Sequence, residues 1–308
     1  MDTYIGDIID SQRNDTRNGD TEAIATDEFV RFNNAAQRYL FGRITLTYNY
    51  AFEKVGDAIT TTANEDTYSI DDNLAFGTRI TTVWYRPNGI ANSEYRLRPT
   101  PNRPDRLIQG TRPRYYRRRK GQIILEPAPD NANDTIVPVY ERALDTLDIR
   151  RARINGTPSS TDITIDAPTA AEAAYFVENT YLCVSDAFGT PLLYNGIISS
   201  YSSNVITLTD NVSNYLQTGV ALADLDNAYI TLGKYTTTHS ELPNEAEDYF
   251  VEWVNRKLHN IDSSEQFAET DQILTELRDT IVASYYIPDK DVKDFPVSDF
   301  DLLIPGYE

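Results

Sequence analysis

The sequence predicts an α+β fold: a helical bundle of one N-terminal helix plus two C-terminal helices, a central antiparallel β region, and an inserted small all-β barrel or sandwich. Three observations predict this fold. Apolar residues recur at helical spacing near both ends of the 308-residue chain. Between those ends the apolar pattern changes to a period of two. Residues 152–238 differ in composition, because Ser, Thr, Asn and Ala dominate there and basic residues are almost absent.

The first helix is expected from Thr26 to Gly42. Thr26 is a good N-cap, Asp27 and Glu28 place negative charge in the first turn, and Gly42 is placed to end the helix. Residues 1–25, which precede it, are polar and rich in Asp, Asn and Thr. We expect them to form an irregular arm, or one that a partner orders.

The central β region is expected between Ile44 and Tyr140. The predicted strands are residues 68–70, 78–85, 94–97, 122–126 and 135–140, with Pro87-Asn88-Gly89 as a turn. Pro138 lacks a backbone N–H, so its strand is expected at an edge of the sheet.

The predicted insert has five short strands at regular spacing, at residues 162–166, 180–185, 192–199, 204–209 and 228–232. Asn195-Gly196 tolerates the positive φ of a type I′ turn, which predicts a two-residue hairpin at that point.

Helical spacing returns after residue 240. One helix is expected from Ala246 to about Ile261, and a second from about Ser264 to Tyr285, where Pro288 follows. We therefore divide the chain into an N-terminal arm (1–25), a core (26–151 and 239–287), an inserted all-β domain (152–238) and an extended C-terminal tail (288–308). The tail alternates acids with apolar residues, which suits a segment that orders when it binds.

Chemical motifs are scarce. The chain has two histidines, His239 and His259, and one cysteine, Cys183, so no His/Cys metal cluster is expected. No glycine-rich phosphate loop, Gly-x-Ser-x-Gly elbow or HExxH occurs. We expect no enzyme, no metal and no cofactor, although a hydrolase with a carboxylate pair stays open among 47 acidic residues. No apolar run approaches the roughly 18–20 residues that a membrane span needs, and no signal peptide is visible, so a soluble protein made in the cytoplasm is expected, with no membrane contact.

One short segment is strongly basic, although the chain as a whole has a net charge of −19. Its members are Arg112, Arg114, Arg117, Arg118, Arg119 and Lys120. Arg86, Arg96, Arg98, Arg103 and Arg106 extend the basic region. These arginines face acids of the same or a neighbouring chain, or phosphates of nucleic acid with Tyr115 and Tyr116 available for stacking, or only water. A head-to-tail ring would use this separation of charge, because the positive flank of one subunit could bind the negative flank of the next.

Four segments together resemble phage head-to-tail adaptor (connector) proteins. They are FVRFNNAAQRYLFGRI, the Tyr-rich TYSIDDNLAFGTRITTVWY, YYRRRKGQIILEPAPDNANDTIVPVYERALDTL with its Pro-x-Pro between two strands, and ELPNEAEDYFVEWVNRKL before a last helix. The match covers about residues 26–150 and 240–290. Two features differ from the family pattern: Ile70-Asp71 replaces a Leu-Pro, and residues 152–238 have no counterpart in compact members.

The resemblance implies a virion protein at the head-to-tail interface, in the neck below the portal. It implies a ring, typically of twelve copies, that joins the portal to tail or nozzle proteins and surrounds the channel through which genomic DNA passes. Docking on the portal would fall to the tail, through Phe295, Phe300, Leu302, Leu303, Ile304 and Tyr307. The alternative function is a carbohydrate- or surface-binding phage module that uses the inserted β domain.

Overall fold

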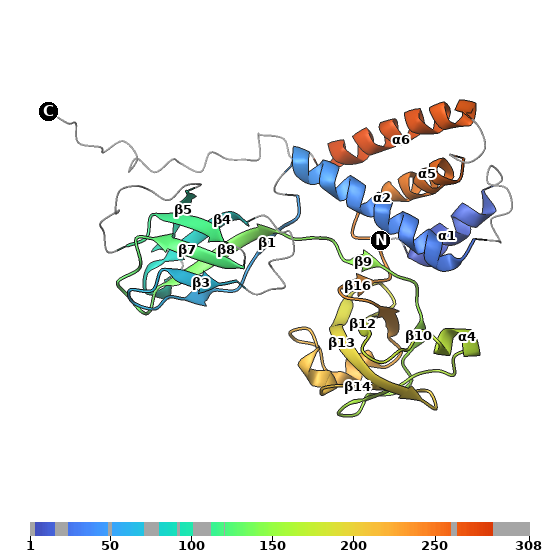
Figure 1. Cartoon of the computed structure of the whole chain (residues 1–308), viewed down its shortest axis with the longest axis horizontal. Coiled ribbons are helices and arrows are strands. Elements are labelled where there is room, and N and C mark those ends of the chain that lie inside the picture. The colour runs from blue at the N-terminus through green and yellow to red at the C-terminus, as the bar shows by residue number, and fades with distance from the viewer. Residues whose placement is uncertain are drawn as a thin grey trace.

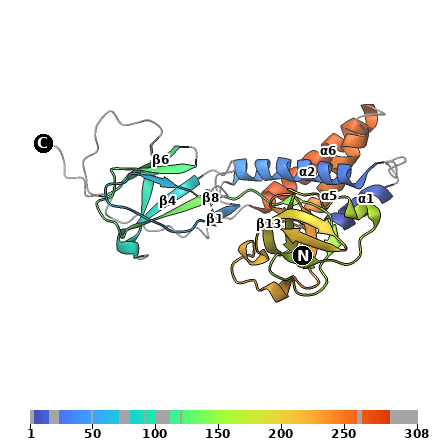
Figure 2. The ribbon, with the colours of Figure 1, turned by 60° about the horizontal axis from the view of Figure 1, so that its bottom comes forward.

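The computed structural model describes residues 4–15, 24–48, 51–70, 80–90, 93–100, 112–119, 121–259 and 264–285. These residues form three parts: a layer of helices, an eight-stranded sheet and a six-stranded sheet (Figure 1). The eight-stranded sheet extends to one side of the other two parts in both views (Figures 1 and 2). Each part has its own apolar core.

The helical layer draws its helices from both ends of the chain. They are α1 (Ile5–Asn14), α2 (Thr26–Thr47), α5 (Ala246–His259) and α6 (Ser264–Ser284). Their common core includes Ile8 of α1, Phe29 and Ile44 of α2, Phe250 of α5 and Ile281 of α6, each at most 1% exposed. The N-terminal and C-terminal segments therefore fold as one unit.

The expected irregular chain over residues 1–25 is wrong at α1. Its apolar positions Ile5, Ile8 and Ile9 are spaced for one helix face, and all three are buried. The other residues of this segment are mostly polar, so its composition is that of a loop. The first turn of α2 does carry Asp27 and Glu28, but the N-cap is Ala25 rather than Thr26.

The expectation that Gly42 ends α2 is wrong. The helix continues to Thr47, because Leu40 and Ile44 on either side of the glycine are both fully buried. Glycine in a helix interior costs only about 1 kcal/mol relative to alanine. Burial of one large aliphatic side chain contributes about 1.5–3 kcal/mol, which outweighs that cost.

The expected fold class is wrong as well. The described chain is mostly β, with curled sheets and only a few helices, and it contains no three-helix bundle of one N-terminal and two C-terminal helices. Two causes account for the error. The α1 segment was overlooked, and the helices cover the ends of a chain whose long middle, from Glu53 to Thr237, consists mainly of short strands.

The eight-stranded sheet runs in the order β1-β8-β4-β5-β6-β7-β3, and β2 also pairs with β8. Its strands are β1 (Glu53–Val55), β2 (Ile59–Thr60), β3 (Thr67–Ser69), β4 (Ile80–Arg86), β5 (Tyr95–Pro99), β6 (Tyr115–Arg119), β7 (Gln122–Glu126) and β8 (Thr135–Glu141). The short link between β2 and β3 crosses from one end of this order to the other. The sheet is therefore curled, and Tyr68 of β3 shares a core with Ile136 of β8.

Sequence periodicity located these strands well, but the position expected for one of them within the sheet is wrong. The predicted strands at residues 122–126 and 135–140 and the turn at Asn88-Gly89 are confirmed. The edge position expected from Pro138 is wrong, because β8 pairs with β4 on one side and with β1 and β2 on the other. Pro138 lies opposite the break between β1 and β2, where its carbonyl accepts a hydrogen bond from the Gly56 N–H.

The six-stranded sheet runs in the order β10-β15-β12-β13-β14-β11. Its strands are β10 (Ala152–Arg153), β11 (Asp162–Thr164), β12 (Tyr181–Ser185), β13 (Pro191–Ser202), β14 (Val205–Leu208) and β15 (Tyr229–Leu232), with the one-turn helix α4 (Ala170–Ala173) outside them. A parallel pair, β9 (Thr146–Leu147) with β16 (Thr236–Thr237), lies between this sheet and α2 (Figure 1).

The hairpin expected at Asn195-Gly196 is wrong. The strand β13 continues through both residues, and Asn195, with φ of 59°, lies where the β12–β13 register is irregular. The positive φ that asparagine tolerates here serves a bulge within a strand. The tight turn comes later, between β13 and β14, where Ser203 and Asn204 both have positive φ, as a type I′ turn requires.

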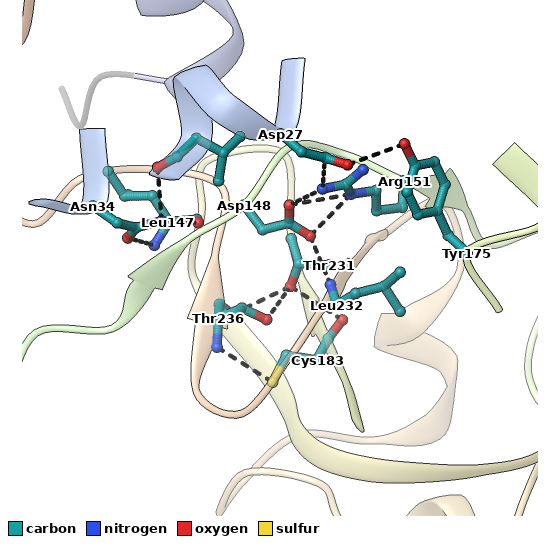
Figure 3. A network of polar contacts seen from close by, with 11 residues as sticks. Asp27, Asn34, Leu147, Asp148, Arg151, Tyr175, Cys183, Thr231, Leu232 and Thr236 are labelled. Carbon is teal, nitrogen blue, oxygen red and sulfur yellow. Dashed lines mark hydrogen bonds and ion pairs between the residues drawn. The ribbon is translucent and has the colours of Figure 1, made fainter. Parts of the chain in front are cut away.

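A buried ion pair joins the helical layer to the six-stranded sheet (Figure 3). The Arg151 guanidinium donates to Asp148 Oδ1 at 2.6 Å and to Asp27 Oδ1, on the first turn of α2, at 2.7 Å. Asp148 also accepts the Leu232 N–H of β15 at 2.8 Å. Burial raises the pKa of Asp148, and the Arg151 charge and hydrogen bond oppose that rise. The same acid thus holds an arginine and a strand of the sheet.

Further contacts extend this junction along α2 and around Asp27. The Asn34 side chain bonds both to the Leu147 N–H and to its carbonyl, as a third β partner would. The Gln37 amide donates to the Asp145 carbonyl at 2.7 Å. The Tyr175 hydroxyl donates to Asp27, and the Arg151 guanidinium lies 4.6 Å from the centre of the Tyr175 ring. The junction is therefore polar and specific in its geometry.

We predict that Asp148→Ala lowers the free energy of unfolding by about 3–5 kcal/mol, because it leaves Arg151 short of charge compensation and the Leu232 N–H without an acceptor. Urea denaturation followed by circular dichroism measures the change. Asp279→Ala is the matched control: it removes an aspartate paired with Arg278 that is 64% exposed, and its expected cost is below about 1 kcal/mol. Equal effects of the two substitutions would contradict the role given to Asp148.

Candidate interaction surfaces

The basic segment forms part of the outer surface of the eight-stranded sheet. Side chains alternate along β6, so that Tyr116 enters the core and Arg117 and Arg119 point the other way. The neighbouring strand β5 pairs in parallel with β6, with Arg98 opposite Tyr115. Paired residues share a face of the sheet, so the outward face of β5 adds its own arginines to that of β6.

Among the described residues, few of these arginines are paired with an acid. Arg117 pairs with Glu126 of β7 at 3.5 Å, and Arg86 pairs with Glu94 at 2.7 Å. The others that are exposed and have no acidic partner among the described residues are Arg96, Arg112, Arg114, Arg118 and Arg119. We call these five residues and Arg117 the basic face. By the alternation along β6, Arg118 lies on the side of Tyr116, at the exposed end of the strand, and the outward side carries Arg117 and Arg119.

Two further observations describe the surroundings of the basic face. Arg117 Nε and Glu126 Oε2 are buried and have no hydrogen-bond partner in the described part of the chain. Arg112 and Arg114 lie close enough to Tyr95 to lower its pKa, although burial outweighs them and raises the pKa of Tyr95 to about 12. The positive charges are thus concentrated at one place, and buried polar atoms beneath them lack partners.

The structure brings together five of the six basic residues singled out from the sequence, on β6 and in the segment just before it. Lys120 lies outside the described residues, as do Arg103 and Arg106. The expected docking residues of the tail also lie outside the described residues: Phe295, Phe300, Leu302, Leu303, Ile304 and Tyr307. Arg96 joins the basic face only through the register of β5.

A cleft of about 670 Å³ lies where the eight-stranded and six-stranded sheets approach one another. At one wall, the Tyr194 hydroxyl donates to the buried Asp145 carboxylate, and the Tyr194 ring lies 5.4 Å from that of Tyr235. Lys54 of β1 and Lys234 also line the cleft, and both are exposed. Burial raises the pKa of Asp145, while Tyr194, Arg142 and Lys54 act to lower it.

Sequence reasoning missed both the junction and the cleft. One local signal was present for the junction: Asp148 and Arg151 stand three residues apart, a spacing that permits pairing, just after the acid Asp145. The cleft offered no such signal, because Lys54, Arg142 and Lys234 come from segments roughly 90 residues apart in the sequence.

Metal clusters, membrane-spanning helices and thiols are the remaining features of the described residues. No group of three or more His, Cys, Asp or Glu side chains among them is arranged to hold a metal ion. No helix in the described ranges has the length and apolar character needed to span a bilayer. Cys183 is buried, and burial raises its thiol pKa.

Comparison with known proteins places this arrangement in a family. A family model described as SU10 adaptor protein matches residues 3–195, a range that contains α1, α2, the whole eight-stranded sheet and part of the six-stranded sheet. No curated protein matches the chain. The resemblance to phage head-to-tail adaptors is therefore confirmed. Because the match covers more than half of the chain, the protein belongs to the SU10 adaptor family and is a structural adaptor of a phage virion.

Proposed function

We propose that this protein forms a ring in the phage neck that joins the portal to the tail and surrounds the channel for DNA. The family match is the observation that carries the proposal. Membership of a family of structural adaptors implies a non-enzymatic role and contact with other virion proteins. The ring, its channel and its portal contact are the specific form that we propose for that role.

The distribution of charge supports a head-to-tail ring. The basic face lies on the eight-stranded sheet, whereas the six-stranded region carries Arg153 and Lys234 as its only basic residues. Its exposed acids are Asp166, Glu172, Glu178, Asp210, Asp224 and Asp226. A positive surface and a negative surface at different places on one chain suit a heterologous contact, in which each copy offers one surface to each neighbour.

We therefore assign the basic face, with Lys120, to the joint between subunits. Arginine suits this position because its planar guanidinium makes paired hydrogen bonds to carboxylates and keeps its charge. Phosphates of DNA are the competing ligand for the same arginines, and the experiment below separates the two.

We predict that reversing two charges, Arg118→Glu with Arg119→Glu, weakens ring assembly by tenfold or more, because attraction to an acidic surface becomes repulsion. Mass photometry over a concentration series, at low and high salt, measures assembly. The matched control is Arg38→Glu with Arg43→Glu, two exposed arginines of α2 that undergo the same change of charge.

Two outcomes would contradict this assignment. Equal loss of assembly in both double variants would show an effect of net charge alone. Intact rings that lose only salt-sensitive binding of double-stranded DNA would give the arginines to phosphates.

The tail supplies the proposed portal contact. Its apolar residues Phe295, Phe300, Leu302, Leu303, Ile304 and Tyr307 lie among acids, so a docked tail would bury apolar anchors while its charged residues stay in water. Segments that order on binding can cover a long surface of the partner.

We predict that deletion of residues 288–308 abolishes portal binding, since the apolar anchors are lost together. Negative-stain images of the protein mixed with portal, and co-sedimentation of the two, measure binding. A chain whose residues 288–308 keep their composition in scrambled order is the control, and it is expected to bind at least tenfold more weakly than the natural chain. Equal portal binding by the truncated and the natural chain would contradict the docking assignment.

A further inference from the structure

The cleft between the two sheets has the features of a site for an acidic peptide that carries aromatic side chains. Its volume of about 670 Å³ lies within the range of ligand pockets. Lys54, Lys234 and Arg142 bring three positive charges to its lining, from β1, from the loop after β15 and from the link after β8. Tyr194, Tyr215 and Leu216 offer apolar surface beside them.

The two lysines are available to a ligand. Neither Lys54 nor Lys234 has an ion pair among the described residues, and both are exposed. Lys234 Nζ lies 4.3 Å from the centre of the Tyr181 ring, which holds the ammonium without neutralising it. Arg142 is paired with Glu241, and Asp145 accepts the Tyr194 hydroxyl. The unpaired charge of the lining, apart from Asp57, is therefore positive.

The end of α6 lies next to this cleft. The Tyr285 ring is 5.5 Å from that of Phe52, and the Phe52 carbonyl accepts the Arg142 N–H at 2.8 Å. Ser284 and Tyr285 also border a hollow that contains Glu241, the ion-pair partner of Arg142. Tyr285 is thus two contacts away from a residue that lines the cleft.

The sequence beyond Tyr285 has the chemistry that the cleft would accept. Asp294–Asp301 reads DFPVSDFD, with three acids, two phenylalanines and no basic residue. Asp294 lies nine positions beyond Tyr285, and an extended chain of nine residues spans about 30 Å. The segment can therefore reach the cleft of its own chain without a long detour.

We propose that in the free subunit the cleft binds the Asp294–Asp301 segment of the same chain. Its carboxylates meet Lys54 and Lys234, and its phenylalanines lie against the tyrosines. The tail is then stored on its own subunit until a partner with greater affinity removes it. This inference does not rest on the ring or on portal docking, since it concerns the isolated protein.

Hydrogen–deuterium exchange of the full-length protein tests the proposal. Lys54→Glu with Lys234→Glu is expected to speed exchange of the amides in residues 294–301 about tenfold, because the segment is repelled from the cleft. Lys257→Glu, which changes an exposed lysine of α5, is the control for charge and is expected to leave that exchange as in the natural protein. Unchanged exchange of the strands β12 and β15 checks that the variants are folded.

A second variant tests the same contact from the other side. Phe295→Ala with Phe300→Ala is expected to speed exchange in residues 192–196 and 214–217, which line the cleft. Equal exchange of residues 294–301 in the natural protein and in both lysine variants would overturn the proposal. Protection that grows with protein concentration would also overturn it, because the occupant would then be the tail of a second copy.

Discussion

The buried pair of Asp148 and Arg151 is the interaction on which the arrangement of the chain depends. It touches Asp27 of α2 on one side and the Leu232 N–H of β15 on the other, so one charged group is shared by a helix and a sheet that fold around separate cores. Two ions taken out of water gain little net stability from each other. Their partners must nevertheless be placed correctly, and this requirement fixes how the two parts meet.

The eight-stranded sheet is held by its connecting segments and not by this ion pair, and its placement determines which surfaces are exposed. It connects to the rest through the segment after α2 and the segment after β8, which meet where the Phe52 carbonyl accepts the Arg142 N–H. The sheet stands to one side of the acidic six-stranded part (Figures 1 and 2). Its basic face thus lies on a different part of the chain from the exposed acids of the six-stranded sheet, which leaves those arginines available to other molecules.

Local pattern predicted the elements better than it predicted their assembly. Local pattern located Gln122–Glu126 to the residue, because a short apolar run stands between Gly121 and Pro127, and Ile123, Ile124 and Leu125 are all buried. It failed where tertiary contacts overrode a local preference. Gly42 lies inside a helix held by Ile44, Asn195 uses its positive φ in a bulge, and Pro138 is accommodated in a central strand by a break in the strands beside it. In each case the residue type was understood, but its neighbour in space was unknown.

The two candidate sites also differ in how far the sequence could predict them. A run of arginines is visible in any sequence, but which of them lack a partner depends on register: Glu126 neutralises Arg117 because β7 returns beside β6, and Arg96 joins the group because β5 runs parallel to β6. The cleft is harder to predict, since its three cations meet only after both sheets have folded and lie beside one another. A site built from such distant segments depends on the assembled chain, so its presence depends on how the eight-stranded sheet is connected to the rest as much as on the lysines themselves.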